Sequence, residues 1–484
     1  MISPIHMKDM YKTDHRRQYP DKTSLVYSNI TARGSRIAGA DKVVVFGIQY
    51  FIKDYLQRRF DDGFFSKPKE QVIKTYKRRL DNALGKDAVP MEHIEKLHDL
   101  GYLPIRIKAL EEGTLCPMRV PMLTIENTKS EFFWLVNFLE TILCNVTWGA
   151  MTSATIAYQY KKVLTEYAKK TSDIEGFVNW QGHDFSMRGM FGLEAALISG
   201  AGHLTSFTGT DTIPAIDFLE HYYGADSDKE LIGGSVPATE HSVMCLGGEG
   251  TELETYRRLM TQVYPAGIVS IVSDTWDYWA VLENIIKTLK PEIMSRNGKV
   301  VIRPDSGVPE DIICGNPNAV PGTPEYKGSI EILWDIFGGE VNSKGYKQLD
   351  SHIGLIYGDS ITLDRCKEIC KRLEQKGFAS TNIVLGIGSY TYQHVTRDTF
   401  GFAMKSTYGI ISGKPCEIFK APKTDNGIKN SAKGLLRVNE DLTLSECVTE
   451  EQYETGLLKD VFVDGILVRE TTLNEVRQKI LSTL

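Results

Sequence analysis

Polar residues follow several apolar, strand-like runs of this chain at the point where each run ends. The runs with their polar ends are Gly267–Asp274, Lys299–Gly307, Ile353–Ser360 and Asn382–Ser389. Asp274 and Arg303 are 29 residues apart, and Asp359 and Gly386 are 27 residues apart. One strand, one helix and two loops need about 30 residues. Because α/β barrels place their chemistry at the carboxyl ends of parallel strands, the spacing predicts such a barrel with a polar site.

The segment Arg303-Pro-Asp-Ser-Gly307 carries the most specific local chemistry. The planar guanidinium of Arg303 matches the oxygens of a phosphate group. Asp305 lies two residues further on and is a candidate for orienting Mg²⁺ or a sugar hydroxyl. An arginine–aspartate pair that closes the strand end explains the same residues, and the sequence leaves both interpretations open.

Three more segments hold candidates with two interpretations each. The imidazole of His241 suits a base, a phosphate contact or a nucleophile, although a structural histidine is the more common case. Asp211 either caps a predicted helix over 213–223 or accepts a hydrogen bond from a ligand N–H group. Phe185 either packs in the core or stacks on a flat heterocycle, and Arg188 suits a phosphate.

The loop Gly386-Ile-Gly-Ser389 leaves backbone N–H groups open to a phosphate, as loops after the late strands of α/β barrels often do. Arg397 and Lys405 add positive charge further along the chain. Together, the cations, aspartates and aromatic rings indicate a phosphate-rich substrate that carries a planar base. The chain lacks a P-loop and a Rossmann glycine motif, which argues against an ordinary ATPase or dehydrogenase.

Length and composition indicate a globular enzyme of two or three domains. The 484 residues are 42% hydrophobic and 24% charged, which is ordinary for this class. The net charge of −6 argues against a nucleic-acid binder, and no apolar run predicts a membrane span. The N-terminus lacks an apolar signal core, and the eight cysteines lack zinc-type spacing. We therefore expect a cytoplasmic protein with reduced thiols, such as Cys366 and Cys370.

The predicted elements divide the chain into two domains. We expect residues 1–150 with 396–484 to form an outer α+β domain, and 151–395 to form a barrel-like α/β domain. The expected strands cover 103–109 and 122–126, and the expected helices cover 131–145, after a Ser130 N-cap, 152–171 and 473–484. Dense glycine and proline predict a loop insertion over the site at 309–347, with a helix at 328–336.

In their order along the chain, the polar segments resemble the nicotinamide phosphoribosyltransferases, a family of type II phosphoribosyltransferases. The matching segments are Asp9–Pro20, Phe46–Tyr50, His183–Arg188, Gly209–Thr212, Ser235–His241, Val272–Asp274, Arg303–Gly307, Asn342–Lys347, Gly358–Asp359 and Thr396–Asp398. The resemblance spans nearly the whole chain. It implies transfer of the phosphoribosyl group from phosphoribosyl pyrophosphate to nicotinamide, giving nicotinamide mononucleotide and pyrophosphate in NAD salvage.

The resemblance also implies a fold, cofactors and partners. The family combines an irregular α/β barrel-like domain with an outer domain built from both chain ends. Its members use Mg²⁺, take ATP as an optional coupling substrate, and form homodimers that share their active sites. An N-terminal arm of each subunit would reach the site of the other. The net charge and the lack of a long apolar run predict that neither a nucleic acid nor a membrane is a partner.

The roles of the family's residues can be transferred to matching positions of this chain. Phe185 and Tyr11, the latter acting across the dimer, would stack on the two faces of nicotinamide, and Asp211 would accept from its carboxamide. Arg303 and Arg188 would bind phosphate or pyrophosphate, and Asp305 and Asp274 would orient the ribose and Mg²⁺. The ribose and its 5′-phosphate would contact Gly358, Asp359, Gly388 and Ser389, and Arg397 and Lys405 would add positive charge near that phosphate. The catalytic His241 would be phosphorylated by ATP.

Two departures from the family concern phosphate binding. The family's run of three glycines is interrupted here by Ile387, Ser389 and Tyr390, and Ala403 stands where a serine is expected. The nearest rival is a nicotinate phosphoribosyltransferase. Asp211 separates the two, because a carboxylate attracts an amide N–H group but repels a second carboxylate. A non-catalytic nucleotide-binding protein is a more remote alternative.

Overall fold

The chain folds into two compact units in a computed structural model, which describes residues 2–358, 360–422, 424 and 430–484. The first unit contains Met1–Thr155, Phe218–Ala225 and Val395–Thr483, and the second contains Ile156–Asp217, Asp226–His394 and Leu484. We expected 218–225 in the barrel-like domain, but it packs with the first unit. Tyr223 explains this, because its hydroxyl donates to Glu112 Oε2 at 2.7 Å and its ring stacks on Phe46 with the centroids 4.9 Å apart.

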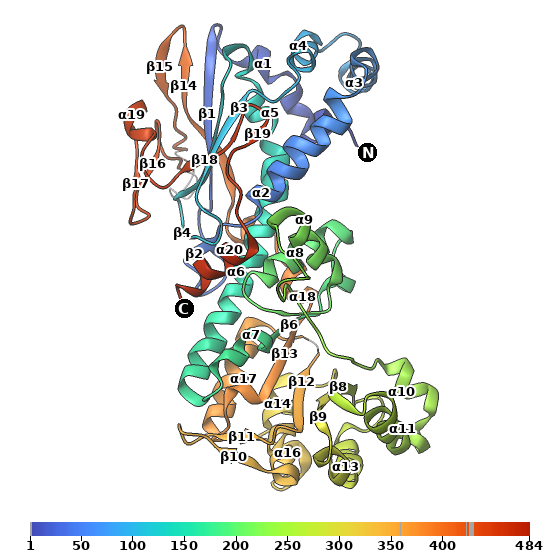
Figure 1. The fold of residues 1–484 in the computed structure, drawn as a ribbon. Coiled ribbons are helices and arrows are strands. Elements are labelled where there is room, and N and C mark those ends of the chain that lie inside the picture. The colour runs from blue at the N-terminus through green and yellow to red at the C-terminus, as the bar shows by residue number, and fades with distance from the viewer. Residues whose placement is uncertain (1, 359, 423, 425–429) are drawn as a thin grey trace. The chain divides into compact units, whose positions relative to one another are not determined.

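The first unit is built on an antiparallel sheet to which both chain ends contribute (Figure 1). Its strands follow the order β15-β14-β1-β5-β3-β18-β19. They are β1 (Thr23–Thr31), β3 (Ile105–Ala109), β5 (Pro121–Asn127), β14 (Ala403–Ile411), β15 (Lys414–Glu417), β18 (Lys459–Val463) and β19 (Ile466–Leu467). The strands predicted at 103–109 and 122–126 are confirmed as β3 and β5.

Helices and short strands complete the first unit. They are α1 (His15–Gln18), β2 (Lys42–Val44), α2 (Ile48–Tyr50), α3 (Lys69–Leu84), α4 (Glu92–Leu100), β4 (Leu115–Pro117), α5 (Leu135–Phe138), β16 (Arg437–Val438), β17 (Leu444–Ser445), α19 (Glu450–Tyr453) and α20 (Leu473–Leu481). The predicted C-terminal helix is confirmed as α20, which begins after a capping box formed by Thr472 and Glu475.

One guanidinium faces three carboxylates on this sheet. Arg106 of β3 binds Glu454 and Asp460, in each case at 2.6 Å between nitrogen and oxygen. Glu126 lies opposite Arg106 on β5, but its Oε1 is 3.4 Å from Arg106 Nη1. Burial raises the pKa of Glu126 to about 7, and the charge of Arg106 opposes this rise. Glu126 is therefore the carboxylate that costs stability when it ionises.

Replacing Glu126 with glutamine should stabilise the protein at alkaline pH. The neutral form of Glu126 is favoured in the folded state, so wild-type stability falls as pH rises from about 4.5 toward about 7. Glutamine removes this loss. We therefore expect the free energy of unfolding to rise by up to about 3 kcal/mol at pH 8 and to be unchanged near pH 4.5. Denaturant melts at both pH values measure this. An equal change in stability at both pH values, or lower stability at pH 8, would contradict the raised pKa of Glu126. Glu92→Gln, which changes an exposed glutamate, is the control.

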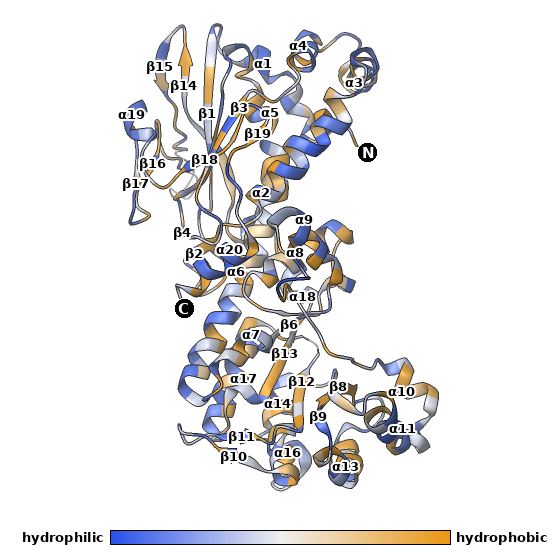
Figure 2. Ribbon diagram, viewed as in Figure 1, coloured by the Kyte–Doolittle hydropathy of each residue, from blue (hydrophilic) through white to orange (hydrophobic). Residues whose placement is uncertain are grey.

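The second unit contains a parallel sheet surrounded by helices (Figure 1). Its strands follow the order β7-β6-β13-β12-β9-β8. They are β6 (Gly182–Asp184), β7 (Gly209–Thr210), β8 (Ala266–Val272), β9 (Asn297–Arg303), β12 (Ile353–Tyr357) and β13 (Ile383–Ile387). Figure 2 shows β12 and β13 coloured as hydrophobic, which is typical of parallel strands in α/β folds.

The helices of this unit alternate with its strands along the chain. They are α7 (Val178–Gln181), α8 (Gly192–Leu204), α10 (His241–Gly247), α11 (Glu252–Arg258), α12 (Tyr278–Ala280), α13 (Lys290–Met294), α17 (Leu363–Gln375) and α18 (Ser389–Gln393). Two further helices, α6 (Glu140–Thr171) and α9 (Ile213–Tyr223), run through both units. The helix predicted at 213–223 is confirmed as α9.

A short segment between β7 and β8 joins the two edges of the parallel sheet. Gly234 forms a parallel bridge with Gly209 of β7, and Ala238 forms one with Ser270 of β8. The Ser270 N–H also donates to Pro237 O at 2.8 Å. With this segment included, the strands follow one another around a barrel in sequence order. The predicted barrel-like α/β fold is therefore confirmed.

One long helix replaces the two helices that we predicted between 131 and 171. α6 is continuous through Gly149, whereas 130–138 holds a 3₁₀ turn and the short α5. A glycine inside a helix costs about 1 kcal/mol, and the complete burial of Ala150 and Met151 outweighs this cost. The predicted Ser130 N-cap is also wrong, because Ser130 is the first residue of the turn and Lys129 before it makes no side-chain capping bond.

The segment 309–347 is largely structured, and our prediction of a loop insertion is wrong. It contains α14 (Pro309–Cys314), α15 (Pro324–Lys327), α16 (Ser329–Phe337) and β10 (Gly339–Val341), which pairs with β11 (Lys347–Leu349). The helix predicted at 328–336 is confirmed as α16. Pro309 and Pro324 begin helices, where proline is tolerated, and Gly315 approaches Gly328 too closely for a Cβ atom. Helix starts and close backbone packing thus account for part of the composition.

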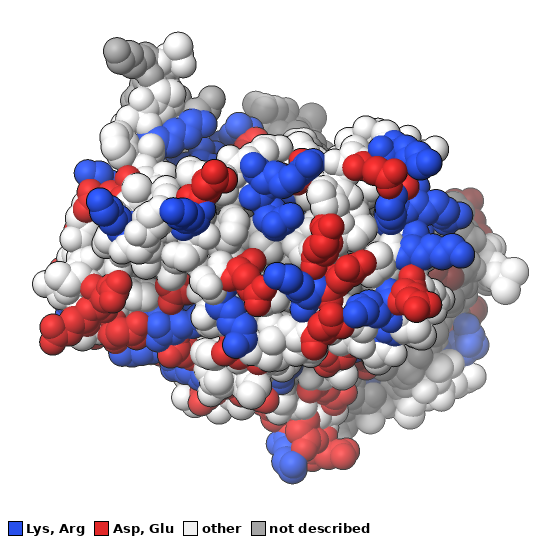
Figure 3. Space-filling view, turned by 90° about the horizontal axis from the view of Figure 1, so that it is seen from above, with Lys and Arg blue, Asp and Glu red and all other residues white. Residues whose placement is uncertain are grey.

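One face of the molecule carries side chains of both charges. Figure 3 shows Lys and Arg interspersed with Asp and Glu on the face that it draws, which is typical of a solvated surface. Within the ranges that the structure describes, no helix has the length and apolar character needed to cross a membrane.

Candidate active site

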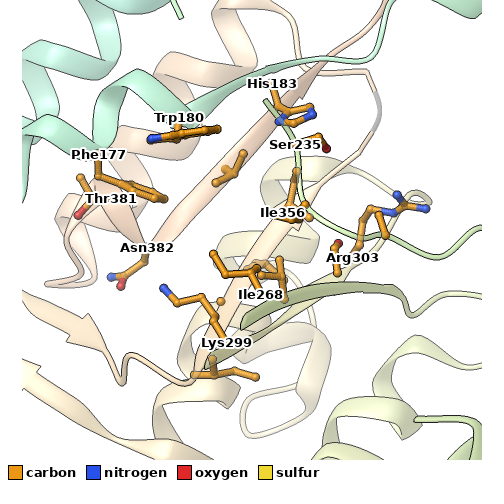
Figure 4. A pocket seen from close by; sticks show the side chains of 18 of the residues that line it. Phe177, Trp180, His183, Ser235, Ile268, Lys299, Arg303, Ile356, Thr381 and Asn382 are labelled. Carbon is orange, nitrogen blue, oxygen red and sulfur yellow. The ribbon is translucent and has the colours of Figure 1, made fainter. Parts of the chain in front are cut away.

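The barrel of the second unit encloses a cavity of about 440 Å³. The strands β8, β9, β12 and β13 and the segment 235–238 contribute to its wall. Phe185, Asp211 and Arg303, all predicted site residues, line this one cavity. Figure 4 shows Arg303 at the same end of the cavity as His183 and Ser235. This is the end where the parallel strands finish, as the strand-end argument requires.

Two neighbouring side chains hold the carboxylate of Asp211. His183 Nε2 lies 2.9 Å from Asp211 Oδ1, and the Ser235 hydroxyl donates to the same oxygen at 2.6 Å. Burial opposes ionisation of Asp211, but the bonds from His183 and Ser235, together with the charge of Arg303, hold its pKa below the ordinary value. Asp211 also lines the cavity, and its role as an acceptor for a ligand N–H group stays a prediction.

Phe185 lies in the cavity wall and not in the packed core. Its ring is tilted by 39° against His183, with the centroids 4.5 Å apart. Gly386 of β13 makes room for it, because a Cβ atom there would lie 2.7 Å from Phe185 Cδ2. The half-buried ring is thus available to stack on a flat heterocycle next to Asp211.

A chain of polar contacts links the catalytic candidates at the strand ends. Arg303 Nη2 donates to Thr239 O at 2.7 Å, and its Nε lies 3.8 Å from Asp305 Oδ1. The Asp305 N–H donates to Asp274 Oδ2 at 3.1 Å, and His241 Nε2 lies 3.1 Å from Asp274 Oδ1. Arg303 therefore neighbours Asp305 at the strand end and also faces the cavity, and its binding of a phosphate stays a prediction.

Asp274 and Asp305 together offer the oxygen ligands that Mg²⁺ prefers. Among the described residues, no group of three or more His, Cys, Asp or Glu side chains could hold a metal ion. Mg²⁺ commonly binds one or two carboxylates together with substrate phosphates and water. The donor set therefore fits a cation that arrives with a phosphorylated substrate.

Gly358 gives Asp305 the space that it occupies. A Cβ atom at Gly358 would lie 2.0 Å from Asp305 Oδ1, which is far inside contact distance. The sequence predicted Gly358 as a substrate contact, and the structure adds this packing role. Asp359, its predicted neighbour in the site, lies outside the described residues.

The Gly358→Ala variant should therefore displace the Asp305 carboxylate and reduce kcat/KM. A misplacement of about 1 Å can cost about 100-fold in rate, and we expect a loss of at least about tenfold. Steady-state kinetics measure this loss, with phosphoribosyl pyrophosphate, the substrate that the resemblance implies, as the varied substrate. Gly176→Ala is the matched control, because a Cβ there meets nothing within 4 Å. Unchanged kinetics in a folded Gly358→Ala protein would contradict this role of Gly358.

The remaining predicted residues of the second unit lie beside the short helix α18. Gly388 directly precedes α18, and Ser389 is its first residue. Ser389 packs so closely on Gly189 that a Cβ at Gly189 would lie 2.0 Å from Ser389 Oγ. Arg188, the residue before Gly189, is exposed and forms no hydrogen bond or ion pair with a described residue.

Three predicted residues belong to the first unit. Tyr11 is 64% exposed in the turn Met10–Asp14, and Arg397 begins the turn Arg397–Thr399. Lys405 lies on β14 opposite Asn29 of β1. Burial lowers the pKa of Lys405, and nearby cations act in the same direction. The structure thus describes the predicted residues as two groups, one in each unit.

The structure adds three residues that the sequence analysis did not select, and it places Lys420, which the sequence assigns to a basic late loop, near Lys405. His183 and Ser235 lie within segments that we singled out, but their contact with Asp211 depends on how the barrel closes. Arg33 and Lys420 are the cations near Lys405. Arg33 follows β1, and the pairing of β1 with β14 brings these distant parts of the sequence together.

Two family models match this chain. The model of the nicotinate phosphoribosyltransferase (NAPRTase) family matches residues 180–466. The model of the nicotinamide phosphoribosyltransferase N-terminal domain matches residues 5–107.

Relatives and a solved structure agree with these matches. A nicotinamide phosphoribosyltransferase of Acinetobacter baylyi is 53% identical over 100% of this chain and 98% of its own length. One of Mycoplasma genitalium is 37% identical over 88% of this chain and 93% of its own length. The crystal structure of nicotinate-nucleotide pyrophosphorylase from Pyrococcus furiosus shares the fold, with a TM-score of 0.59 and 14% sequence identity. The match covers 100% of this chain and 95% of that chain. The chain therefore belongs to the nicotinate phosphoribosyltransferase family.

Proposed function

We propose that this protein transfers the phosphoribosyl group from phosphoribosyl pyrophosphate to nicotinamide, giving nicotinamide mononucleotide and pyrophosphate in NAD salvage. The observation that carries the proposal is the ionised Asp211 beside the Phe185 ring in one cavity. A ligand with an aromatic ring and an amide group matches these two residues, because the ring can stack on Phe185 and the amide N–H can donate to Asp211. Two relatives that align with this chain over more than 90% of their own length are named nicotinamide phosphoribosyltransferase, which supports nicotinamide over nicotinate as the acceptor.

The chemistry needs orientation and charge stabilisation more than proton transfer. The lone pair of the pyridine nitrogen forms a bond to the anomeric carbon, and the bond from that carbon to the pyrophosphate oxygen breaks with its electrons. Phe185 and Asp211 would orient the ring for this step. Arg303 would stabilise the negative charge that develops on the leaving pyrophosphate. No general base is required, because the attacking nitrogen carries no proton.

The cofactors that we propose follow from the same residues. Asp274 and Asp305 would hold Mg²⁺ together with oxygens of phosphoribosyl pyrophosphate, and the bound ion would offset the charge of the leaving group. His241 is half exposed at the start of α10 and would accept a phosphoryl group from ATP, with release of ADP, in an optional coupling reaction. Its contact with Asp274 would orient the ring.

We further propose a homodimer with shared active sites. Phe191, Leu193 and Tyr390 are large apolar residues of the second unit that are 87%, 59% and 63% exposed. Such residues are typical of surfaces that bind another protein. The exposed Tyr11 would then reach the nicotinamide site of the other subunit. We place the protein in the cytoplasm, where its eight free cysteines would stay reduced.

Mixing two inactive variants tests the shared site. Tyr11→Ala and Asp211→Ala homodimers should each have little activity, but a heterodimer regains one native site if Tyr11 acts across the interface. Random exchange of equal amounts should restore about a quarter of the wild-type activity. Mass spectrometry of the intact dimer verifies the exchange. No recovery after verified exchange would contradict the shared site.

Product analysis tests the reaction itself. Purified protein with phosphoribosyl pyrophosphate, Mg²⁺ and nicotinamide should release mononucleotide and pyrophosphate in equal amounts. Tight binding of nicotinamide or mononucleotide without turnover would overturn the proposal and support the non-catalytic nucleotide-binding alternative.

A further inference from the structure

The barrel cavity continues beyond the end where Asp211 and Arg303 lie. Its volume of about 440 Å³ falls in the range of about 300–1,000 Å³ that is usual for drug-sized ligands, and one pyridine carboxamide fills a fraction of it. Most α/β barrels fill their interior with layers of large side chains. Here Ser270 and Gly354 lie in the wall, and Ile268 in the same wall is 42% exposed. The barrel is therefore hollow toward the amino ends of its strands.

Lys299 is the cation of this second end of the cavity. It lies four residues before Arg303 on β9, so both side chains point to the same face of the strand. Figure 4 shows its amine directed toward the side of the cavity where Asn382 and Phe177 lie. Its stem lies over Gly354, where an added Cβ would come within 3.2 Å of Lys299 Cδ. The glycine therefore leaves the space in which the lysine stem packs.

Lys299 differs from its polar neighbours because they already have partners. Asn382 Oδ1 accepts from Gln348 Nε2 at 2.7 Å, and Asn382 Nδ2 donates to backbone carbonyls. Lys299 makes no hydrogen bond or ion pair with any residue in the described part of the chain. Burial lowers the pKa of Lys299, and Asp350, which opposes this, is itself bound by His352 at 2.7 Å. A partly desolvated ammonium without a partner is stabilised by an anion.

The two ends of the cavity thus have opposite charge preferences. At one end the ionised Asp211 repels a carboxylate, and at the other end Lys299 attracts one. Phe177 and Trp180 add aromatic surface at the Lys299 end (Figure 4). Aromatic side chains bind flat rings through offset or edge contacts. The combination of a cation and aromatic walls matches a flat ring that carries a carboxylate.

We propose that the Lys299 end of the cavity is a second ligand site, which binds a small aromatic carboxylate. The carboxylate pairs with Lys299, and the ring packs against Trp180 and Phe177. Binding at this site does not require phosphoribosyl transfer, so it can be measured without turnover. The result of that measurement is therefore independent of whether the proposed reaction takes place.

Titration of 4-fluorobenzoate followed by ¹⁹F NMR tests the proposal. Wild-type protein should show saturable binding, and Lys299→Met should bind roughly 10- to 100-fold more weakly, since hydrogen bonds to charged groups are worth about 1.5–3 kcal/mol. Lys290→Met, which changes an exposed lysine of the same unit, should bind as wild type does. The neutral 4-fluorobenzamide should be insensitive to Lys299→Met. Thermal melts verify folding, and Lys299→Gln is a second neutral variant.

Three results would overturn the proposal. The first is equal binding of 4-fluorobenzoate by wild type and both Lys299 variants. The second is the absence of saturable binding to wild type. The third is tighter binding by Asp211→Asn with no effect of Lys299→Met, because this would place the carboxylate at the opposite end of the cavity.

Discussion

Replacing Asp211 with asparagine should reduce the preference for nicotinamide over nicotinate by roughly 100- to 1,000-fold. Two carboxylates 4 Å apart repel each other by about 4 kcal/mol at an effective dielectric constant of about 20, and every 1.4 kcal/mol is a factor of ten. Asparagine keeps the shape of the side chain and its contacts with His183 and Ser235 but removes this repulsion. The ratio of kcat/KM for the two bases measures the effect.

Asp217→Asn is the matched control for this experiment. Asp217 is an exposed aspartate on α9, the helix that follows Asp211, and it does not line the cavity. Its replacement should leave the ratio of kcat/KM unchanged. If Asp211→Asn also keeps the wild-type ratio, then Asp211 does not select the base, and another part of the cavity must do so.

Replacing Arg303 with alanine should lower kcat/KM by roughly 100- to 1,000-fold. Removal of one preorganised donor to a developing negative charge costs about 2.7–4 kcal/mol in comparable sites. Arg303 is held by its bond to Thr239 O and by the neighbouring Asp305, so its guanidinium is positioned before substrate binds. Lysine keeps the charge but loses the planar fork. Arg303→Lys should therefore recover part of the lost activity.

The exposed Arg258 provides the control for Arg303. It lies at the end of α11 in the same unit, and Arg258→Ala should keep wild-type kinetics. Pyrophosphate release under subsaturating phosphoribosyl pyrophosphate measures all three variants. A folded Arg303→Ala protein with less than tenfold loss would show that leaving-group stabilisation comes from elsewhere.

Strand periodicity was sufficient to predict the barrel and to predict that polar candidate residues gather at one end of it. Asp274, Arg303 and Asp305 follow apolar runs of regular length, and parallel strands bring such ends together. The closure of the barrel was not predictable in the same way. The segment 234–238 that joins β7 to β8 has no strand pattern, because it forms isolated bridges and contains proline. The contacts of Ser235 depend on that closure.

Other errors came from residues whose effect depends on packing. We predicted two helices with a gap between 145 and 152, but the burial of Ala150 and Met151 in that gap keeps α6 continuous. The prolines and glycines of 309–347 suggested a loop, but Pro309 and Pro324 begin helices, and Gly315 and Gly328 permit close backbone contact. In the sequence, Lys299 is the first residue of a strand-like run, and nothing near it in the sequence indicates a ligand site. Its position inside a hollow barrel becomes visible once the side chains that surround it are placed.

The most direct measurement is a competition between the two bases. Purified protein receives phosphoribosyl pyrophosphate, Mg²⁺ and equal concentrations of nicotinamide and nicotinate, and the two mononucleotides are separated and quantified. We predict nicotinamide mononucleotide as the dominant product, together with an equal amount of pyrophosphate. Nicotinate mononucleotide as the main product, or no product from either base, would contradict the account.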